Sequence, residues 1–206
     1  MEFSNIIQQR RSIKSYDAEK SISDAELKEL FEEVILSPSS FNLQHWTFIA
    51  VKDSEQKKLL REAAWGQQQV EDCSVAIVVC SKLDAYKDAP EIHKNAPKEV
   101  QEGMLPMIKN FYEGKEQLQR DEAIRSASLA AMTLMYAAKS RGLDTGPMIG
   151  FDPEATSKLL NLTPSYIPVM LLVLGHQKNA PRPRDGRRPI EEIVRLNTLD
   201  GPGLTG

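Results

Sequence analysis

The residues of this chain that could do chemistry begin with a basic run near the amino terminus. Residues 10–16 contain Arg10, Arg11, Ser12 and Lys14, followed by a second serine and a tyrosine. Guanidinium groups bind phosphate oxygens through paired hydrogen bonds, and a serine hydroxyl adds one more donor. The run therefore predicts a phosphate site, in which Lys14 could hold negative charge on a larger ligand. A plain basic helix end, whose cations offset the helix dipole, is the alternative interpretation.

A second motif lies between a helical pattern and a strand pattern. It spans residues 37–46 and contains Pro38, Ser39, Ser40 and Asn42, before a glutamine and a tryptophan. These small polar residues supply many hydrogen-bond donors and acceptors. They are also ordinary choices for a helix-to-strand turn, which is the competing interpretation.

In this order and at this spacing, the two motifs resemble the nitroreductase family, which are homodimeric FMN-dependent oxidoreductases. The resemblance implies that Arg10, Ser12 and Lys14 contact the FMN phosphate, ribityl chain and pyrimidine edge, with Arg11 as a further cofactor-binding candidate. It also implies that the loop with Pro38, Ser39, Ser40 and Asn42 comes from the other subunit and borders the flavin. The site would then exist only in a dimer.

Two further segments match flavin contacts of that family. Gln67 and Gln69 have amides that can donate and accept at the N3 and O2 edge of the isoalloxazine, while Gln68 is expected to face away. Some relatives have a lysine here, so Lys14 would be the only cation near N1. The segment of Pro147, Met148, Ile149 and Gly150 matches a loop whose backbone amides approach flavin N5 and O4. A solvated glutamine loop and a structural turn are the alternatives.

The remaining candidates are less specific. Arg187 matches the C-terminal phosphate-binding arginine of the family, although Arg182 and Arg184 lie close enough to confuse the register. Phe111 and Tyr112 are candidates for stacking on a substrate, and packing is the alternative for both. The three histidines form no triad or metal-ligand spacing, so no side chain is predicted to be catalytic and no metal is expected. The backbone of Ile149 and Gly150 would support chemistry at flavin N5.

Composition limits the classes of function. The chain has 206 residues, 41% hydrophobic residues and a net charge of −3, which suits one globular domain rather than a nucleic-acid binder. We find no signal-peptide pattern and no apolar run long enough for a membrane span, so a cytoplasmic protein is expected. Cys73 and Cys80 are predicted to be buried thiols.

Hydrophobic periodicity predicts one α+β domain over residues 1–206. Helices are expected at 2–10, after the capping box 23–26, at 54–64, at 121–141 and from Asp152; strands are expected at 46–51, 75–79 and 167–175. Residues 145–151 should form a bend. The Pro-interrupted segment 82–119 is predicted to be an inserted helical lid. The resemblance implies a three-layer sandwich with a mixed central sheet flanked by helices, and a domain-swapped homodimer in which residues 190–206 form an arm exchanged with the partner.

The reaction that the resemblance implies is a ping-pong hydride transfer from NAD(P)H, through non-covalent FMN, to an electron-poor acceptor such as a nitroaromatic or quinone. Two alternatives stay open. One is other flavin chemistry on the same fold, such as enone reduction, dehalogenation or azoline oxidation. The other is a non-enzymatic dimer that binds flavin without turnover. A paralogue without FMN is a third alternative.

Overall fold

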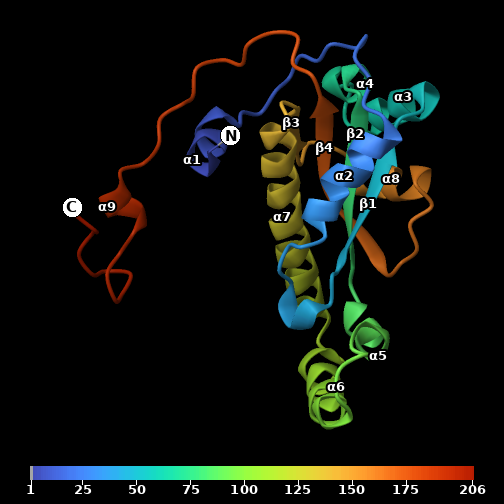
Figure 1. Cartoon of the computed structure of the whole chain (residues 1–206), viewed down its shortest axis with the longest axis vertical. Coiled ribbons are helices and arrows are strands. Elements are labelled where there is room, and N and C mark those ends of the chain that lie inside the picture. The colour runs from blue at the N-terminus through green and yellow to red at the C-terminus, as the bar shows by residue number, and fades with distance from the viewer. Residues whose placement is uncertain (1) are drawn as a thin grey trace.

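A four-stranded sheet forms the centre of the computed structural model, which describes residues 2–206 (Figure 1). Its strands are β1 (Trp46–Val51), β2 (Val75–Lys82), β3 (Asp144–Met148) and β4 (Tyr166–Gly175), in the order β1-β2-β4-β3. All three pairings are antiparallel. We expected a mixed sheet, but the parallel contact is only a single bridge between Ser12 and Thr145. Strand direction has no signature in β2, because a strand buried on both faces is continuously apolar whichever way it runs.

The strand β3 corrects a second expectation. Residues 145–151 were predicted to bend, yet Asp144–Met148 pair with β4 and the chain turns only afterwards. The sequence does not predict this strand because it contains Gly146 and Pro147, and both residue types are rare in strand interiors. Proline is tolerated on an edge strand, where its missing N–H interrupts no ladder, and β3 is the edge of this sheet.

Helices cover both faces of the sheet. In chain order they are α1 (Phe3–Gln9), α2 (Asp24–Val34), α3 (Ser54–Ala63), α4 (Gln69–Asp72), α5 (Ala89–Ile92), α6 (Lys98–Tyr112), α7 (Glu116–Ser140), α8 (Pro153–Leu159) and α9 (Ile190–Ile193). Short 3₁₀ turns occur at Ser40–Asn42 and Ala85–Asp88. The expected capping box at the start of α2 is present, with the Ser23 hydroxyl accepting from the Glu26 N–H. The expected N-cap of α8 is also present, because Asp152 accepts from two N–H groups of the first turn.

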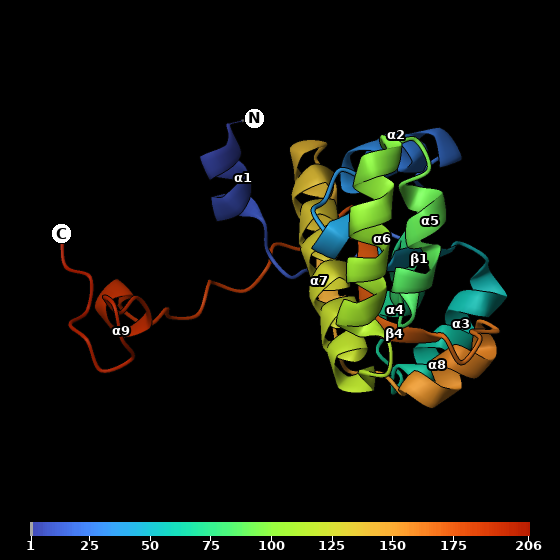
Figure 2. The ribbon, with the colours of Figure 1, turned by 90° about the horizontal axis from the view of Figure 1, so that it is seen from below.

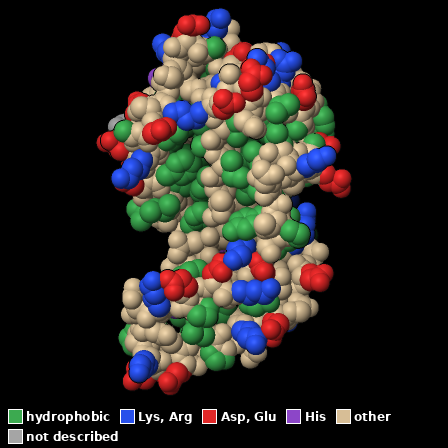
Figure 3. All heavy atoms as spheres, turned by 90° about the vertical axis from the view of Figure 1, so that its right-hand side faces the viewer, with side chains coloured by type: hydrophobic (Ala, Val, Ile, Leu, Met, Phe, Trp, Pro, Cys, Tyr) green, Lys and Arg blue, Asp and Glu red, His purple; other side chains and the backbone are tan. Residues whose placement is uncertain are grey.

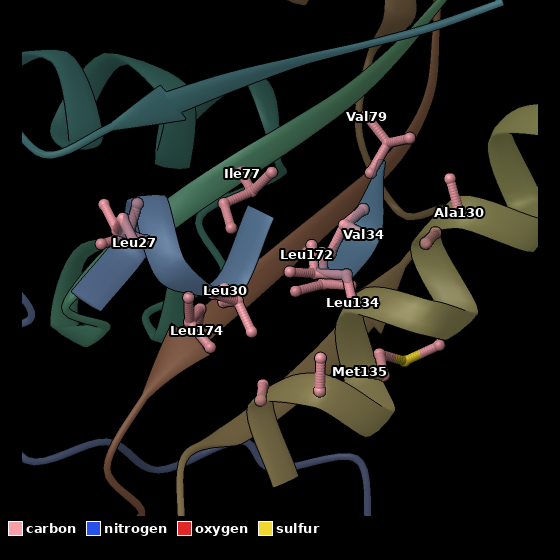
Figure 4. Packing of buried hydrophobic residues seen from close by; sticks show 14 of the residues in the cluster. Leu27, Leu30, Val34, Ile77, Val79, Ala130, Leu134, Met135, Leu172 and Leu174 are labelled. Carbon is pink, nitrogen blue, oxygen red and sulfur yellow. The ribbon is translucent and has the colours of Figure 1, made fainter. Parts of the chain in front are cut away.

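The core lies on the two sides of the sheet. Helices α2 and α7 pack on one face, where Leu30, Leu134 and Leu172 meet (Figure 4). Alanines keep α7 thin at this contact, and each buried leucine contributes about 1.5–3 kcal/mol. The opposite face is covered by α3, α4 and α8, around Leu60, Val70 and other apolar residues. The expected α+β three-layer sandwich is therefore confirmed.

Residues 82–119 are mostly helical and extend beyond one end of the sheet (Figure 1), and Figure 2 shows the same helices from below. Helices α5 and α6 enclose a small apolar cluster of their own, which includes Leu43, Ile108 and Tyr112. In the space-filling view the molecule narrows between this part and the main body (Figure 3). Many charged side chains lie on the surface of the smaller, lower part. Helix α7 begins at Glu116, whereas the sequence predicted a start at residue 121. The prediction missed the first turn because that turn is polar and shows no apolar periodicity. The action of the segment as a lid stays a prediction.

The carboxyl-terminal segment lies away from the body, whereas α1 packs beside α7, where the ring centroids of Phe3 and Tyr136 are 5.5 Å apart. Residues after Gly175 run outward as an extended segment to α9 and the carboxyl terminus (Figures 1 and 2). Most apolar side chains of this segment are exposed, as are Phe3 and Ile7 in α1, and Leu199 is the extreme case at 92%. Such a concentration of exposed apolar residues is typical of a surface that another chain covers. None of the helices described in residues 2–206 has the length and hydropathy needed to cross a bilayer.

Candidate functional site

The edge strand β3 positions the amino-terminal basic run. The N–H of Ile13 donates to the Thr145 carbonyl at 3.0 Å, next to the bridge between Ser12 and Thr145. A Cβ on Gly146 would lie 2.6 Å from the Ile13 carbonyl oxygen, so only glycine permits this approach. At the start of β3, Asp144 receives a 2.9 Å hydrogen bond from Lys139 of α7. The basic run is therefore fixed to the sheet.

The basic run and the segment after β4 enclose a polar cavity of about 490 Å³. Six cationic side chains and one carboxylate line it, namely Arg10, Arg11, Lys14, Arg182, Arg184, Arg187 and Asp185. Desolvation lowers the pKa of Arg184, and the neighbouring cations Arg11, Arg187 and Arg10 lower it further. A cavity with this charge excess attracts an anion. Ser12 lines the same cavity, so the structure brings together all the residues that were predicted to bind phosphate.

The arginines around the cavity differ in what they contact. Arg184 donates 3.0 Å hydrogen bonds to the carbonyls of Gln8 and Arg10, at the carboxyl end of α1. Within residues 2–206, the Arg187 side chain donates hydrogen bonds only to the carbonyls of its own turn, at Asp185 and Gly186. Arg184 therefore caps a helix, whereas the Arg187 guanidinium keeps donors for a ligand.

The predicted amide pair meets the end of β3. Gln67 Nε2 donates to the Gly150 carbonyl at 2.7 Å, and Gln69 Nε2 donates to Gln67 Oε1 at 2.9 Å. Gln69 also contacts the Met148 sulfur at 3.6 Å. Gln68 points the other way, toward Arg61 and Asp72, as expected. Residues 67–69 and 148–150 thus form one group, which the sequence had placed in two separate motifs.

Two donors in this group are free. Neither the Ile149 N–H nor the Gly150 N–H donates a hydrogen bond to any other atom of residues 2–206. Ile149 is 82% exposed, so this part of the backbone lies at the surface and not in the core. Adjacent free N–H groups are suited to an electron-rich heteroatom of a ligand. The role predicted for the backbone of residues 149 and 150 at a flavin stays a prediction.

Trp65 is a residue of this group that the motif analysis missed. Its side chain is 70% exposed, and its backbone has a left-handed φ of 55°. The ring lies beside Gly150, since a Cβ there would be 3.4 Å from Trp65 Cζ3. A bulky residue with positive φ is uncommon. The available sequence signal was a tryptophan followed by glycine at the end of a polar helix.

The second motif forms a tight turn. The Ser39 hydroxyl accepts from the Gln44 N–H at 2.9 Å, and the Asn42 N–H donates to the Ser39 carbonyl at 3.0 Å. Pro38 immediately precedes this turn, and Ser40 begins its 3₁₀ helix. The turn leads directly into β1.

This turn lies at the opposite end of the sheet from the basic run. β1 begins with Trp46 opposite Ser81, at the carboxyl end of β2, whereas Thr145 pairs with Leu174, which also pairs with Val75 at the start of β2. No hydrogen bond or ion pair within residues 2–206 joins residues 38–44 to residues 10–14 or 147–150. One chain therefore brings the basic run together with the Arg187 segment, and the glutamines of residues 67–69 together with residues 148–150. It does not bring the turn of residues 38–44 to either group.

The aromatic pair at the end of α6 divides into one buried and one accessible ring. Tyr112 is 1% exposed, and its hydroxyl donates to Ser40 Oγ at 2.7 Å. Phe111 is 44% exposed and packs edge-on against Phe41, with ring centroids 5.7 Å apart. Of the two rings Phe111 is the accessible one, with Lys115 Nζ 5.7 Å from its ring centroid, and its stacking role stays a prediction.

Comparison with known proteins agrees with this arrangement. A sequence model described as the Nitroreductase family matches residues 7–176. MhqN of Bacillus subtilis, named provisionally as an NAD(P)H nitroreductase, is 39% identical over 201 residues, which cover 94% of this chain and 98% of that protein. DrgA of Synechocystis is 38% identical, over 97% of this chain and 98% of its own length.

A solved structure from Exiguobacterium sibiricum shows the same fold. It is described provisionally as a nitroreductase in complex with FMN, and it superposes with a TM-score of 0.90 at 32% identity, covering 96% of this chain and 98% of that one. The match to the family model and the identities of the relatives extend over nearly the whole chain. The chain belongs to the nitroreductase family.

Proposed function

We propose that this protein is an FMN-dependent oxidoreductase that takes reducing equivalents from NAD(P)H and passes them to an electron-poor acceptor, such as a nitroaromatic or a quinone. The observation that carries the proposal is the connection, through β3, of the basic cavity to the amide group at Gly150. A phosphate and a flavin ring would find their two sets of partners on one strand. The names of MhqN and of the Exiguobacterium sibiricum structure support NAD(P)H and FMN.

The residues fit FMN by the chemistry of their donors. Arg10, Arg187 and the Ser12 hydroxyl would bind the phosphate, and Arg11 adds positive charge. Lys14 would stabilise negative charge at the pyrimidine edge, where Gln67 and Gln69 present amides that both donate and accept. The free N–H groups of Ile149 and Gly150 would face N5 and O4.

FMN, when bound, would supply the redox chemistry by accepting a hydride at N5 and returning electrons to an acceptor. The side chains of this protein would orient the ring, hold its charge and leave one face open. Trp65 and Phe111 are two exposed aromatic side chains that could contact a flat acceptor. No side chain needs to move a proton in this scheme.

We further propose that the protein is a homodimer. The turn of Pro38, Ser39, Ser40 and Asn42 cannot reach the cavity of its own chain, so a partner would supply it. The exposed apolar residues of α9 and the following tail, including Ile190, Ile193 and Leu199, would be covered if residues 190–206 exchange onto the partner. Segment 82–119 would then act as the lid over the acceptor.

A visible absorption spectrum tests the proposal. The purified protein, reconstituted with FMN if needed, should show flavin absorption that bleaches under anaerobic NADH or NADPH and returns when a nitroaromatic or quinone is added. A protein that stays colourless with excess FMN would overturn the cofactor assignment. Bleaching that an enone reverses, when nitroaromatics and quinones do not, would overturn the acceptor class while keeping the flavin.

A further inference from the structure

The turn of residues 38–44 has a strained backbone. Phe41, Asn42 and Gln44 have φ values of 50°, 53° and 48°. Residues other than glycine rarely adopt this region, and Phe41 is the bulkiest of the three. Strained residues persist only where surrounding structure holds them. The contacts that hold this turn therefore decide its shape.

Two side chains from outside the turn form hydrogen bonds with it. The Tyr112 hydroxyl, at the end of α6, donates to Ser40 Oγ at 2.7 Å. His93, which follows α5, contacts the Phe41 carbonyl oxygen through Nε2 at 2.9 Å, and this nitrogen must donate because a carbonyl only accepts. The two contacts act on consecutive residues at the strained point.

The surroundings make the Tyr112 contact rigid. Its ring is packed edge-on against Phe41 and Phe111, and the Tyr86 ring stacks on it with centroids 6.0 Å apart. Burial raises the pKa of Tyr112, so its hydroxyl stays protonated and remains a donor at neutral pH. The Tyr86 hydroxyl makes no hydrogen bond among the residues that the structure describes, although its ring packs in the same stack.

We propose that Tyr112 and His93 are positioning residues that hold residues 38–44 in the shape required by the flavin site. Segment 82–119 would then set cofactor affinity through the turn, in addition to any contact with an acceptor. Neither residue needs to touch the cofactor. The inference rests on the proposed function, because it assumes that the turn borders FMN in a partner subunit.

The test compares Tyr112→Phe with Tyr86→Phe in the full-length protein. Each variant removes one hydroxyl from the same aromatic stack, but only the Tyr112 hydroxyl bonds to the turn. Apoprotein is titrated with FMN, and the visible circular dichroism of the bound flavin is recorded. Tyr112→Phe should raise the Kd for FMN about tenfold and change the flavin dichroism, a size expected for loss of one well-oriented hydrogen bond. Tyr86→Phe should stay within about twofold of the wild type.

A double-mutant cycle with Ser40→Ala identifies the contact responsible. If Tyr112 acts through Ser40, the double variant binds FMN no more weakly than the weaker single variant. Independent, additive losses would mean that Tyr112 acts by another route and would overturn the inference. His93→Ala should weaken FMN binding, while His93→Gln, which retains an amide donor, should restore part of it.

The inference and the proposed function fail in distinguishable ways. Wild-type protein that does not bind FMN overturns the proposed function. Wild-type protein that binds FMN, with unchanged affinity and dichroism in Tyr112→Phe and His93→Ala, overturns the inference alone. If Tyr112→Phe does not fold, the His93→Ala and His93→Gln pair decides, because the His93 side chain is not part of the aromatic stack.

Discussion

The side-chain amide of Gln67 donates a 2.7 Å hydrogen bond to the carbonyl oxygen of Gly150, across 83 positions of sequence. This contact ties the turn before α4 to the residues that follow β3. It leaves the Gly150 N–H free, while the carbonyl of the same residue is occupied. The orientation of the backbone that would face flavin N5 therefore depends on Gln67.

Replacing Gln67 by alanine should weaken FMN binding roughly fivefold, because one hydrogen bond contributes about 1 kcal/mol. Flavin reduction by NAD(P)H should also slow, since the Gly150 N–H loses its fixed direction. Gln68→Ala is the matched control, because Gln68 contacts Arg61 and Asp72 instead. FMN titration and stopped-flow reduction measure both effects. Equal losses in the two variants would contradict the assigned role of Gln67.

Gly150→Ala should disturb the same contact by steric means. The new Cβ would lie 3.0 Å from Gln67 Nε2 and 3.4 Å from the Trp65 ring, so the flexible amide must move. We expect weaker FMN binding with little change in thermal stability. Gly103→Ala in α6 meets no atom within 4 Å and should stabilise the fold by about 0.5–1 kcal/mol, with FMN affinity unchanged.

Replacing Arg184 and replacing Arg187 should have different effects. Arg187→Ala should lower the affinity for FMN about tenfold or more while sparing riboflavin, because only FMN carries the phosphate. Arg184→Ala should instead speed hydrogen exchange in α1, whose terminal carbonyls it caps. Titration with both flavins and exchange mass spectrometry provide the two readouts. The opposite pattern would exchange the roles assigned to the two residues.

Stability should fall on acidification partly because of His45. Burial lowers the pKa of this imidazole below 6.5, and the charge of Glu122 opposes the shift in part. A depressed pKa means that the unfolded chain takes up the proton first. The contribution of neutral His45 to the free energy of unfolding is therefore complete above about pH 6.5, and it is lost as the pH falls through the folded-state pKa of His45. Chemical unfolding across this range should show a weaker pH dependence for His45→Gln than for the wild type.

Both thiols should be inert in the folded protein. Burial raises the pKa of Cys73 to about 12 and that of Cys80 to about 12, so neither forms appreciable thiolate near pH 8. Both cysteines are free, as expected. An alkylating reagent should modify neither residue in the native state and both in denaturant, as measured by intact mass. Fast native labelling of either residue would contradict the closed packing around β2.

Local signals in the sequence were enough for several elements. The capping box at Ser23 and Glu26, the N-cap at Asp152 and the strand Trp46–Val51 were all predicted and are present. Each depends on contacts within one or two turns or on alternation along a few residues. The choice of candidate residues also came from the sequence, because spacing within a motif is local.

What the sequence determined alone was therefore which residues are available and which short elements they form. Tertiary structure decided the rest: β3 became a strand despite Gly146 and Pro147, and Arg184 became a helix cap beside Arg187. It also joined Gln67 to Gly150 and placed the turn at Ser40 at the far end of the sheet. These outcomes depend on hydrogen bonds and packing between residues far apart in the chain. Propensity and periodicity describe only near neighbours, so they carry no information about such pairs.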